Sequence, residues 1–401
     1  MKSKITLTIF LAFIFSMKGF AQLKQGDTTY TYRTIVPQDK QNRLKNVDFI
    51  ANMQYGLRND WSNGDYLGSK FRMEQFRLEI RGWVTDNIYF RFRHRFTSGF
   101  EPQSVDKIIK GVDFAYITAK FNDKWRLTLG KTYADWGGYE FDLNPIDVYE
   151  YSDIIEEADN FLSGIGLSYQ ASPNHQFGLQ ALNPRNRTFD EIYQADTILT
   201  NTTVEASKTP IAGVFTWRGS FFSGKFTTLW HYSVFKEAKD NFKNYMAFGN
   251  MLNLDKVSIA YDYKLSLEDI DRTGIITRVI NQSPTFSGDP STFVFTNTRY
   301  QSHWLNITYR FVPKWQLNVS AFVDQAATEE PGGNSFVKIR TAYGLTPTLE
   351  YFPWDDTNLK FFAGYVGRTF NYTDKIKSAV ALSDDERARV IFGFVAPLKF
   401  L

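Results

Sequence analysis

FRLEIRGWVTDNIYFRFRHRF, residues 76–96, contains two runs of alternating apolar and polar side chains. Alternation with a period of two is typical of a β-strand whose two faces meet different surroundings. The Thr-Asp-Asn sequence between the runs, residues 85–87, favours a tight turn. The segment is therefore predicted to form an antiparallel hairpin, in which the cross-strand pairs are Arg77 with Arg95, Glu79 with Arg93, and Arg81 with Arg91.

The charged side chains of this hairpin share one face, and its apolar side chains share the other. An arginine that faces lipid near the membrane midplane costs roughly 2–4 kcal/mol, so the charged face must border water. We expect it to line the interior of a barrel with five pore-lining basic residues, Arg77, Arg81, Arg91, Arg93 and Arg95. Two roles are open for this strip: it attracts anions, or it ties down loops and pairs with acids of neighbouring strands.

The same alternation recurs along the chain, for example in residues 226–234, 256–268 and 315–324. A soluble sandwich alternates as well, but here tight turns and longer connections follow one another in a regular order. Longer connections are expected at residues 59–68, 97–110, 135–160, 184–208, 269–298 and 372–386. This order predicts an all-β fold, a transmembrane antiparallel β-barrel of about 16 strands with short periplasmic turns and long extracellular loops.

Composition excludes several other classes of protein. The chain of 401 residues has no cysteine, which removes disulfide frameworks, thiolate zinc sites and cysteine nucleophiles. Beyond its N-terminus it has no run of about 18 apolar residues, so a bundle of membrane helices is excluded. The four histidines are far apart, and the HExxH, G-x-S-x-G and phosphate-binding glycine motifs are absent. We therefore expect no enzyme, no cofactor, no metal site and no nucleic-acid partner.

The N-terminus has the pattern of a secretory signal peptide over residues 1–21. Lys2 and Lys4 precede an apolar run, and Gly19-Phe20-Ala21 offers a small-residue cleavage site. Residues 22–46 are expected to be a periplasmic or lumenal segment, and residues 47–401 to be the barrel. Without the leader, Lys and Arg fall from 46 to 43 against 43 Asp and Glu, so charge placement rather than net charge must decide any ion preference.

The connection at about 134–160 is rich in acids and contains neither lysine nor arginine. As the third extracellular loop, it is predicted to fold inward as a constriction loop, with Glu140, Asp142, Asp147 and Glu150 as its principal acids. Its carboxylates would then oppose the arginine strip across a narrow waist. Two alternatives are a calcium site and a solvated surface loop.

The arginine-bearing hairpin and the strand LTLGKTYADWGG, residues 127–138, resemble the phosphate-selective porin O and P family, in the form common among Bacteroidetes-type bacteria. The resemblance in barrel organisation covers roughly residues 47–401. It implies a sixteen-stranded channel that is trimeric, with a constriction loop and basic pore-lining residues. Residues 131–135, Lys-Thr-Tyr-Ala-Asp, depart from the Lys-x-Pro-Phe-like turn that is frequent in that family.

The function expected from residues and resemblance together is an outer-membrane porin of a Gram-negative bacterium. It would allow passive diffusion of small hydrophilic solutes and favour anions such as phosphate, as a homotrimer in outer-membrane lipid. One alternative is a barrel that serves as a surface scaffold or adhesin, which the long connections at 184–208 and 269–298 favour. A barrel-borne hydrolase is the least favoured alternative.

Overall fold

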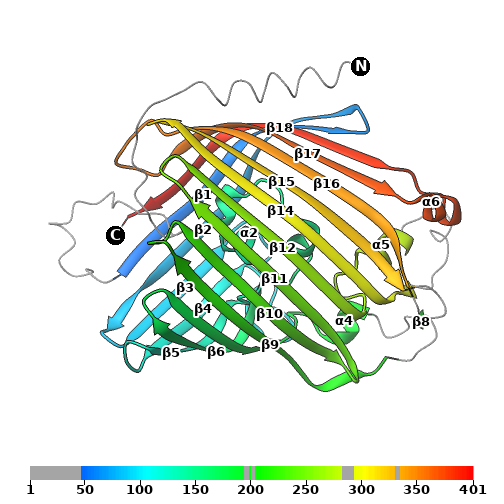
Figure 1. Ribbon diagram of the computed structural model, residues 1–401, viewed down its shortest axis with the longest axis horizontal. Helices are drawn as coiled ribbons and strands as arrows, with labels where there is room; N and C mark the ends of the chain where they lie inside the picture. Colours follow the sequence, from blue (N-terminus) through cyan, green and yellow to red (C-terminus); the bar gives the residue numbers. More distant parts are fainter. Residues whose placement is uncertain (1–46, 194–197, 200–203, 282–292, 330–334, 401) are drawn as a thin grey trace.

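A closed β-barrel of sixteen antiparallel strands forms the body of the protein (Figure 1). The computed structural model describes residues 47–193, 198–199, 204–281, 293–329 and 335–400. The predicted all-β, sixteen-stranded fold is therefore confirmed. The expected signal peptide at 1–21 and the segment at 22–46 lie outside the described residues. None of the helices in the described part of the chain is long and apolar enough to cross a membrane.

The barrel strands follow one another around the wall in chain order, and β1 closes on β18. They are β1 (Val47–Ser62), β2 (Asp65–Thr85), β3 (Ile88–Arg95), β4 (Val112–Lys120), β5 (Trp125–Tyr133), β6 (Phe161–Ser172), β7 (His175–Leu182), β9 (Ala206–Phe221), β10 (Phe226–Ala238), β11 (Asn241–Asn253), β12 (Val257–Ile270), β14 (Thr296–Val312), β15 (Trp315–Glu329), β16 (Phe336–Tyr351), β17 (Lys360–Tyr372) and β18 (Asp385–Lys399). Two short strands, β8 (Ile198–Leu199) and β13 (Phe293–Val294), pair separately in the loops.

The register of the hairpin between β2 and β3 is the predicted one. Arg77 pairs with Arg95, Glu79 with Arg93, and Arg81 with Arg91. On the opposite face, Ile80 pairs with Phe92, whose side chain is 40% exposed on the outside of the barrel. Because side chains alternate between the two faces of a strand, the six charged residues all point into the barrel.

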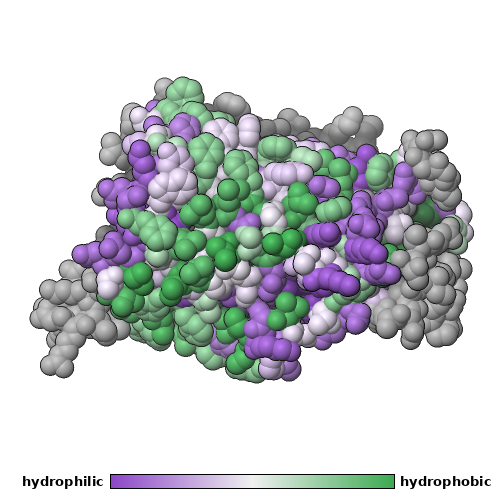
Figure 2. All heavy atoms as spheres, turned by 90° about the horizontal axis from the view of Figure 1, so that it is seen from below, coloured by the Kyte–Doolittle hydropathy of each residue, from purple (hydrophilic) through white to green (hydrophobic). Residues whose placement is uncertain are grey.

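The outer surface is largely apolar where the strands are paired. Figure 2 shows a band of hydrophobic residues through the centre and lower left of one face, with hydrophilic residues at the left edge and toward the end where Figure 1 places α5 and α6. Outward side chains with large exposed fractions come from strands all around the wall: Phe92, Ile117, Ile165, Leu179, Phe215, Leu345, Phe361 and Phe392. Apolar exposure of this extent suits a lipid environment.

The two rims of the barrel differ. One rim carries short turns, of which the first along the chain is residues 86–87 between β2 and β3. The other rim carries the longer loops, which contain the helices α2 (Gly138–Asp142), η2 (Pro145–Asp147), α3 (Asp153–Glu156), α4 (Phe189–Tyr193), α5 (Ile275–Asn281) and α6 (Asp374–Val380). The expected long connection at 59–68 is wrong, because β1 and β2 are joined by Asn63 and Gly64 alone. Both residues have positive φ, 51° and 89°, as a two-residue hairpin turn requires. The connection between β10 and β11 is equally short.

Candidate functional site

The loop between β5 and β6 lies inside the barrel. Its helix α2 donates two backbone hydrogen bonds to Asp262 of β12, from Tyr139 N at 3.0 Å and from Glu140 N at 2.8 Å. At the other end of the loop, Asp153 N donates to Asp324 of β15 at 2.9 Å. The loop is therefore fastened across the lumen to the wall opposite the arginine hairpin.

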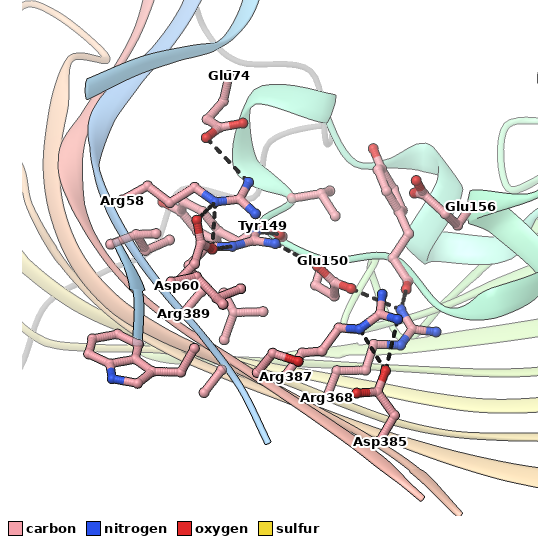
Figure 3. Close-up of a pocket in the computed structure, with 18 of the residues that line it drawn as sticks. Arg58, Asp60, Glu74, Tyr149, Glu150, Glu156, Arg368, Asp385, Arg387 and Arg389 are labelled. Carbon is pink, nitrogen blue, oxygen red and sulfur yellow. Dashed lines mark hydrogen bonds and ion pairs between the residues drawn. The ribbon is translucent and has the colours of Figure 1, made fainter. Parts of the chain in front are cut away.

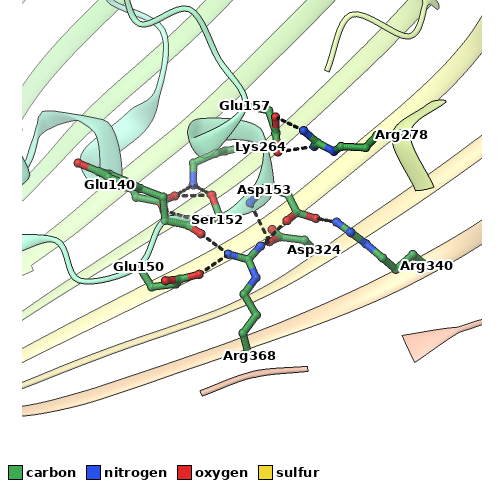
Figure 4. A network of polar contacts seen from close by, with 11 residues as sticks. Glu140, Glu150, Ser152, Asp153, Glu157, Lys264, Arg278, Asp324, Arg340 and Arg368 are labelled. Carbon is green, nitrogen blue, oxygen red and sulfur yellow. Dashed lines mark hydrogen bonds and ion pairs between the residues drawn. The ribbon is translucent and has the colours of Figure 1, made fainter. Parts of the chain in front are cut away.

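Glu140 and Lys264 form the most deeply buried anchor of this loop. Neither side chain is exposed, and the ammonium of Lys264 donates to the Glu140 carboxylate (Figure 4). Glu140 also accepts hydrogen bonds from the backbone and the hydroxyl of Ser152, both at 2.6 Å. A buried carboxylate with this many donors is satisfied within the protein, which contradicts the alternative of a solvated surface loop.

A second anchor joins the loop to β16 and β17. Asp153 of α3 accepts hydrogen bonds from Arg340 and Arg368, one on each carboxylate oxygen. Arg368 also donates to Glu150 at 3.0 Å and to the backbone oxygen of Tyr151 at 2.7 Å, as Figure 4 shows in part. The Arg368 guanidinium therefore binds three loop groups with its fixed set of donors.

The remaining predicted loop acids also bind basic groups of the wall. Asp147 lies 2.7 Å from the ammonium of Lys360 in β17, and Asp142 accepts from Arg218 of β9 at 3.0 Å. Each of the four acids predicted for the loop therefore pairs with a cation of β9, β12 or β17, and not with the arginine strip. Of the four acids, Asp142 lines the same cavity as the arginine strip, whereas Glu140, Asp147 and Glu150 pair with cations on other strands of the wall.

Enclosure in the barrel shifts the pKa of several loop carboxyls. Loss of hydration raises the pKa of Asp147, although Lys360 opposes the shift. Loss of hydration likewise raises the pKa of Glu156, and the charges of Glu150 and Glu157 add to it. At Asp159 the loss of hydration is outweighed by Arg272, which lowers the pKa. In the described part of the chain, no group of three or more His, Asp or Glu side chains is placed to hold a metal ion.

An apolar cluster fills the lumen on the side of β7 to β16. Trp136 of the loop packs edge-on against Tyr245 of β11, with ring centroids 4.5 Å apart. Ile276 of α5 and Val380 of α6 belong to the same buried cluster. Close-packed side chains leave little room for solutes there, and the cavities of the described residues lie mainly along β1 to β9 and β16 to β18.

The first cavity on that side, cavity 1, has a volume of about 1050 Å³ and opens at the loop rim between β1, β2, β17 and β18 (Figure 3). Its basic and acidic side chains are equal in number. The seven cations are Arg58, Lys70, Arg278, Arg340, Arg368, Arg387 and Arg389, and the seven acids are Asp60, Glu74, Glu150, Asp153, Glu156, Glu157 and Asp385. Cavity 1 therefore has no marked excess of either sign.

The second cavity, cavity 2, measures about 720 Å³ and contains the arginine strip. Eight cations line it against four acids. The cations are Arg77, Arg81, Arg91, Arg93, Arg95, Lys110, Lys131 and Arg218, and the acids are Glu79, Asp142, Glu156 and Asp159. The structure thus brings together all five predicted basic residues in one cavity.

The arginines of the strip are not free of acidic partners. Asp113 of β4, which is fully buried, accepts from Arg77 at 3.1 Å and from Arg93 at 3.0 Å. Glu79 accepts from Arg91 at 2.9 Å. The most exposed member is Arg95, whose nearest contact with Asp113 is 3.9 Å and whose Nε donates no hydrogen bond to any described residue.

Arg81 donates to Asp48 of β1 at 3.1 Å, so the strip draws on acids from strands on both sides. The sequence reading missed Asp48 and Asp113. The alternation of side chains along each strand could have identified them, because both lie at inward-facing positions of strands adjacent to the hairpin. The excess of arginine is smaller than the hairpin alone suggested, but cavity 2 still holds twice as many cations as acids.

The cavities are joined end to end by shared wall residues. Gln75, Tyr151 and Glu156 line both cavity 1 and cavity 2. Cavity 2 shares Tyr133, Gln176 and Arg218 with a third cavity, cavity 3, of about 370 Å³. Cavity 3 in turn shares Trp83 and Arg126 with a small space beside the turn residue Asp86, at the opposite rim. A chain of cavities therefore leads from the loop rim past the inserted loop to the turn rim.

A lipid-facing closed barrel with a charged path past an inserted loop defines an outer-membrane diffusion channel. The chain matches the family described as phosphate-selective porin O and P over residues 49–394, and it belongs to this family. It is an outer-membrane porin for the passive diffusion of small hydrophilic solutes, as the sequence predicted. No curated protein sequence matches the chain.

Several solved outer-membrane proteins have a similar fold. The channel DcaP of Acinetobacter baumannii is 11% identical with a TM-score of 0.54, covering 90% of this chain and 99% of that chain. An anion-selective porin from Comamonas acidovorans is 11% identical with a TM-score of 0.54, covering 88% and 99%. OmpF of Salmonella typhi, in complex with daunomycin, is 15% identical with a TM-score of 0.53, covering 87% and 97%. At these identities the likeness concerns the fold.

Proposed function

We propose that this porin favours anions such as phosphate over cations. The observation that carries the proposal is the composition of cavity 2, where eight cations face four acids. The acids Glu140, Asp147 and Glu150 are held by Lys264, Lys360 and Arg368, respectively, on other strands. They therefore cancel little of the positive potential near the arginine strip, and a narrow path through protein strengthens that potential.

The four predicted loop acids serve in this proposal as anchors of the constriction, and two of them also line the path, Asp142 in cavity 2 and Glu150 in cavity 1. Glu140, Asp142, Asp147 and Glu150 fix the loop to the wall, whereas Tyr151 and Glu156 face the junction of cavities 1 and 2. The bore is accordingly set by the backbone that these anchors hold in place. A loop with several buried ion pairs is also unsuited to rapid opening.

The proposed assembly is a homotrimer in outer-membrane lipid, without catalytic activity. Support for the trimer comes from the similar fold of OmpT of Vibrio cholerae, described as a trimer form, at 12% identity and a TM-score of 0.50, covering 87% of this chain and 98% of that chain. The family and fold are those of a channel. Export by a signal peptide at residues 1–21 is part of the same proposal.

The test is the reversal potential of single channels in a planar bilayer under a salt gradient. We expect permeability to chloride and phosphate to exceed that to potassium, and the preference to weaken as salt screens the charges. A cation preference at low salt would contradict the proposal. A barrel that inserts without conducting would instead favour the surface scaffold.

A further inference from the structure

Cavity 3, at the turn end of the path, differs in chemistry from the cavities above it. Aromatic side chains of three consecutive strands line it, namely Trp83 of β2, Tyr89 of β3 and Tyr116 of β4. Trp83 and Tyr89 are cross-strand partners whose ring centroids lie 5.4 Å apart at an interplanar angle of 60°. These rings point inward, because Trp83 and Tyr89 have the same parity as Arg81 and Arg91.

Trp83 presents an open ring surface to the lumen. The residue is 38% exposed, although it lies inside a water-filled barrel rather than against lipid. An aromatic ring left in contact with water is unfavourable, so a ligand that covers it gains free energy from burial. A flat apolar surface beside a water-filled path is suited to the C–H face of a sugar ring.

The rest of cavity 3 includes polar side chains that can hydrogen-bond to the hydroxyl groups of a sugar. Thr118 and Thr128 hydrogen-bond to each other at 2.9 Å on the wall, and Ser168, Gln176 and Gln180 also line the cavity. A few polar groups around an aromatic surface, in a space of about 370 Å³, are typical of small-ligand sites.

Cationic groups lie at both ends of this aromatic surface. Arg81 and Arg91, which line cavity 2, form the cross-strand pair next to Trp83 and Tyr89, about 7 Å away at two residues along the strands. Arg126 lines the cavity on the turn side. A small ligand that lies with its ring on Trp83 would therefore reach a guanidinium with an attached anionic group.

We propose that cavity 3 binds phosphorylated monosaccharides, with the sugar ring on Trp83 and the phosphate at Arg81 and Arg91 in the adjoining wall of cavity 2. This inference rests on the proposed anion preference, and it specifies which class of anionic solute the channel binds. A free sugar lacks the charge that cavity 2 attracts, and inorganic phosphate lacks the ring. A nucleotide base on Trp83 could not be sandwiched between two parallel rings, because Tyr89 is tilted at 60° to Trp83.

The experiment measures block of the chloride current through the reconstituted full-length porin. Glucose 6-phosphate, glucose, inorganic phosphate and AMP are each added from the turn side at increasing concentration. We expect glucose 6-phosphate to block at the lowest concentration, with inorganic phosphate second and glucose without effect. Trp83→Leu should raise the half-blocking concentration of glucose 6-phosphate about tenfold and leave that of inorganic phosphate unchanged.

The matched control is Trp230→Leu, because Trp230 is equally exposed at 38% but faces outward from β10. It should leave every half-blocking concentration unchanged. Equal block by glucose 6-phosphate and inorganic phosphate, tighter block by AMP, or an unchanged response in Trp83→Leu would overturn the sugar phosphate site while anion preference persists. Loss of the anion preference itself in the unaltered porin would instead refute the proposed function.

Discussion

Lys264 of β12 and Glu140 of α2 form an ion pair inside the barrel in which neither side chain is exposed to solvent. Since the two residues are 124 positions apart in the chain, their pairing fixes the inserted loop to the wall by a long-range contact. Removal of one partner of such a pair leaves an uncompensated buried charge, whereas removal of both does not. The pair therefore couples loop position to barrel stability.

We predict that Lys264→Met lowers barrel stability by about 3–5 kcal/mol, because Glu140 is left buried without its cation. The temperature at which the SDS-resistant form unfolds on gels should fall accordingly. The matched control is Lys239→Met, which breaks the exposed pair with Glu205, with side chains 64% and 70% exposed, and should cost about 1 kcal/mol or less. If both variants unfold at the same temperature, the buried pair is not an anchor.

Deletion of residues 140–150 should enlarge the single-channel conductance while the barrel still assembles, because water that enters the widened lumen hydrates Lys264 in place of Glu140. The deleted segment includes Asp147 and Ile146, and Ile146 packs against Phe362 and Val395 on the wall beside cavity 1. Without it, the loop can no longer divide the lumen. As a control, deletion of α6, which lines neither cavity 1 nor cavity 2, should change the conductance less. An unchanged conductance in the first deletion would place the constriction elsewhere.

The hairpin register and the inward face of the arginines could be predicted because they depend on local rules. A tight turn fixes the pairing of the residues on either side, and a period of two fixes their faces. The same rules explain the error at the first hairpin. Asn63-Gly64 is a strong two-residue turn signal, yet the polar residues around it were read as a loop.

The partners inside the lumen could not be predicted, since they depend on how the barrel closes and on how the loop folds. Glu140 meets Lys264, and Asp153 meets Arg340 and Arg368, across 124 to 215 positions of sequence. The alternation of apolar and polar residues cannot predict contacts between residues so far apart in the sequence. The acidic loop does follow β5, but of its four predicted acids only Asp142 lines the cavity of the arginine strip.

The arginine strip offers a direct test of ion preference. We predict that Arg81→Glu, Arg91→Glu and Arg95→Glu together shift the reversal potential toward cations, most strongly at low salt, because the change of about six charges lies within a Debye length of ~8–10 Å of the path. These three side chains are 19–31% exposed, whereas Arg77 and Arg93 are needed to neutralise buried Asp113. Buried Glu79 loses Arg81 and Arg91 in this variant but keeps its cross-strand neighbour Arg93.

The control for that experiment is Phe92→Arg, which adds charge on the lipid side of the same strand. It should impair assembly, since an arginine facing the membrane midplane costs roughly 2–4 kcal/mol. Normal assembly of Phe92→Arg would show that the two faces have been assigned the wrong way round. An unchanged reversal potential in the triple variant would show that the strip does not set the preference.

We predict that the anion preference depends on pH through the ionisation of Glu156. The residue lines both cavity 1 and cavity 2, so its carboxylate stands at their junction and repels anions when ionised. Loss of hydration and the neighbouring Glu150 and Glu157 raise its pKa, so it gains a proton at a higher pH than an ordinary glutamate. As the pH falls through that raised pKa, the negative charge disappears and the preference for anions should increase.

The variant Glu156→Gln isolates this effect, because the amide keeps the size of the side chain and removes its charge. We expect a higher anion preference than in the unaltered porin at neutral pH, and little further change on acidification. Reversal potentials measured at intervals of pH check both points. Glu205→Gln, at an exposed position of the loop rim, should keep the full pH dependence. If the pH dependence survives in Glu156→Gln, or if acidification of the unaltered porin lowers the anion preference, then Glu156 does not control the junction.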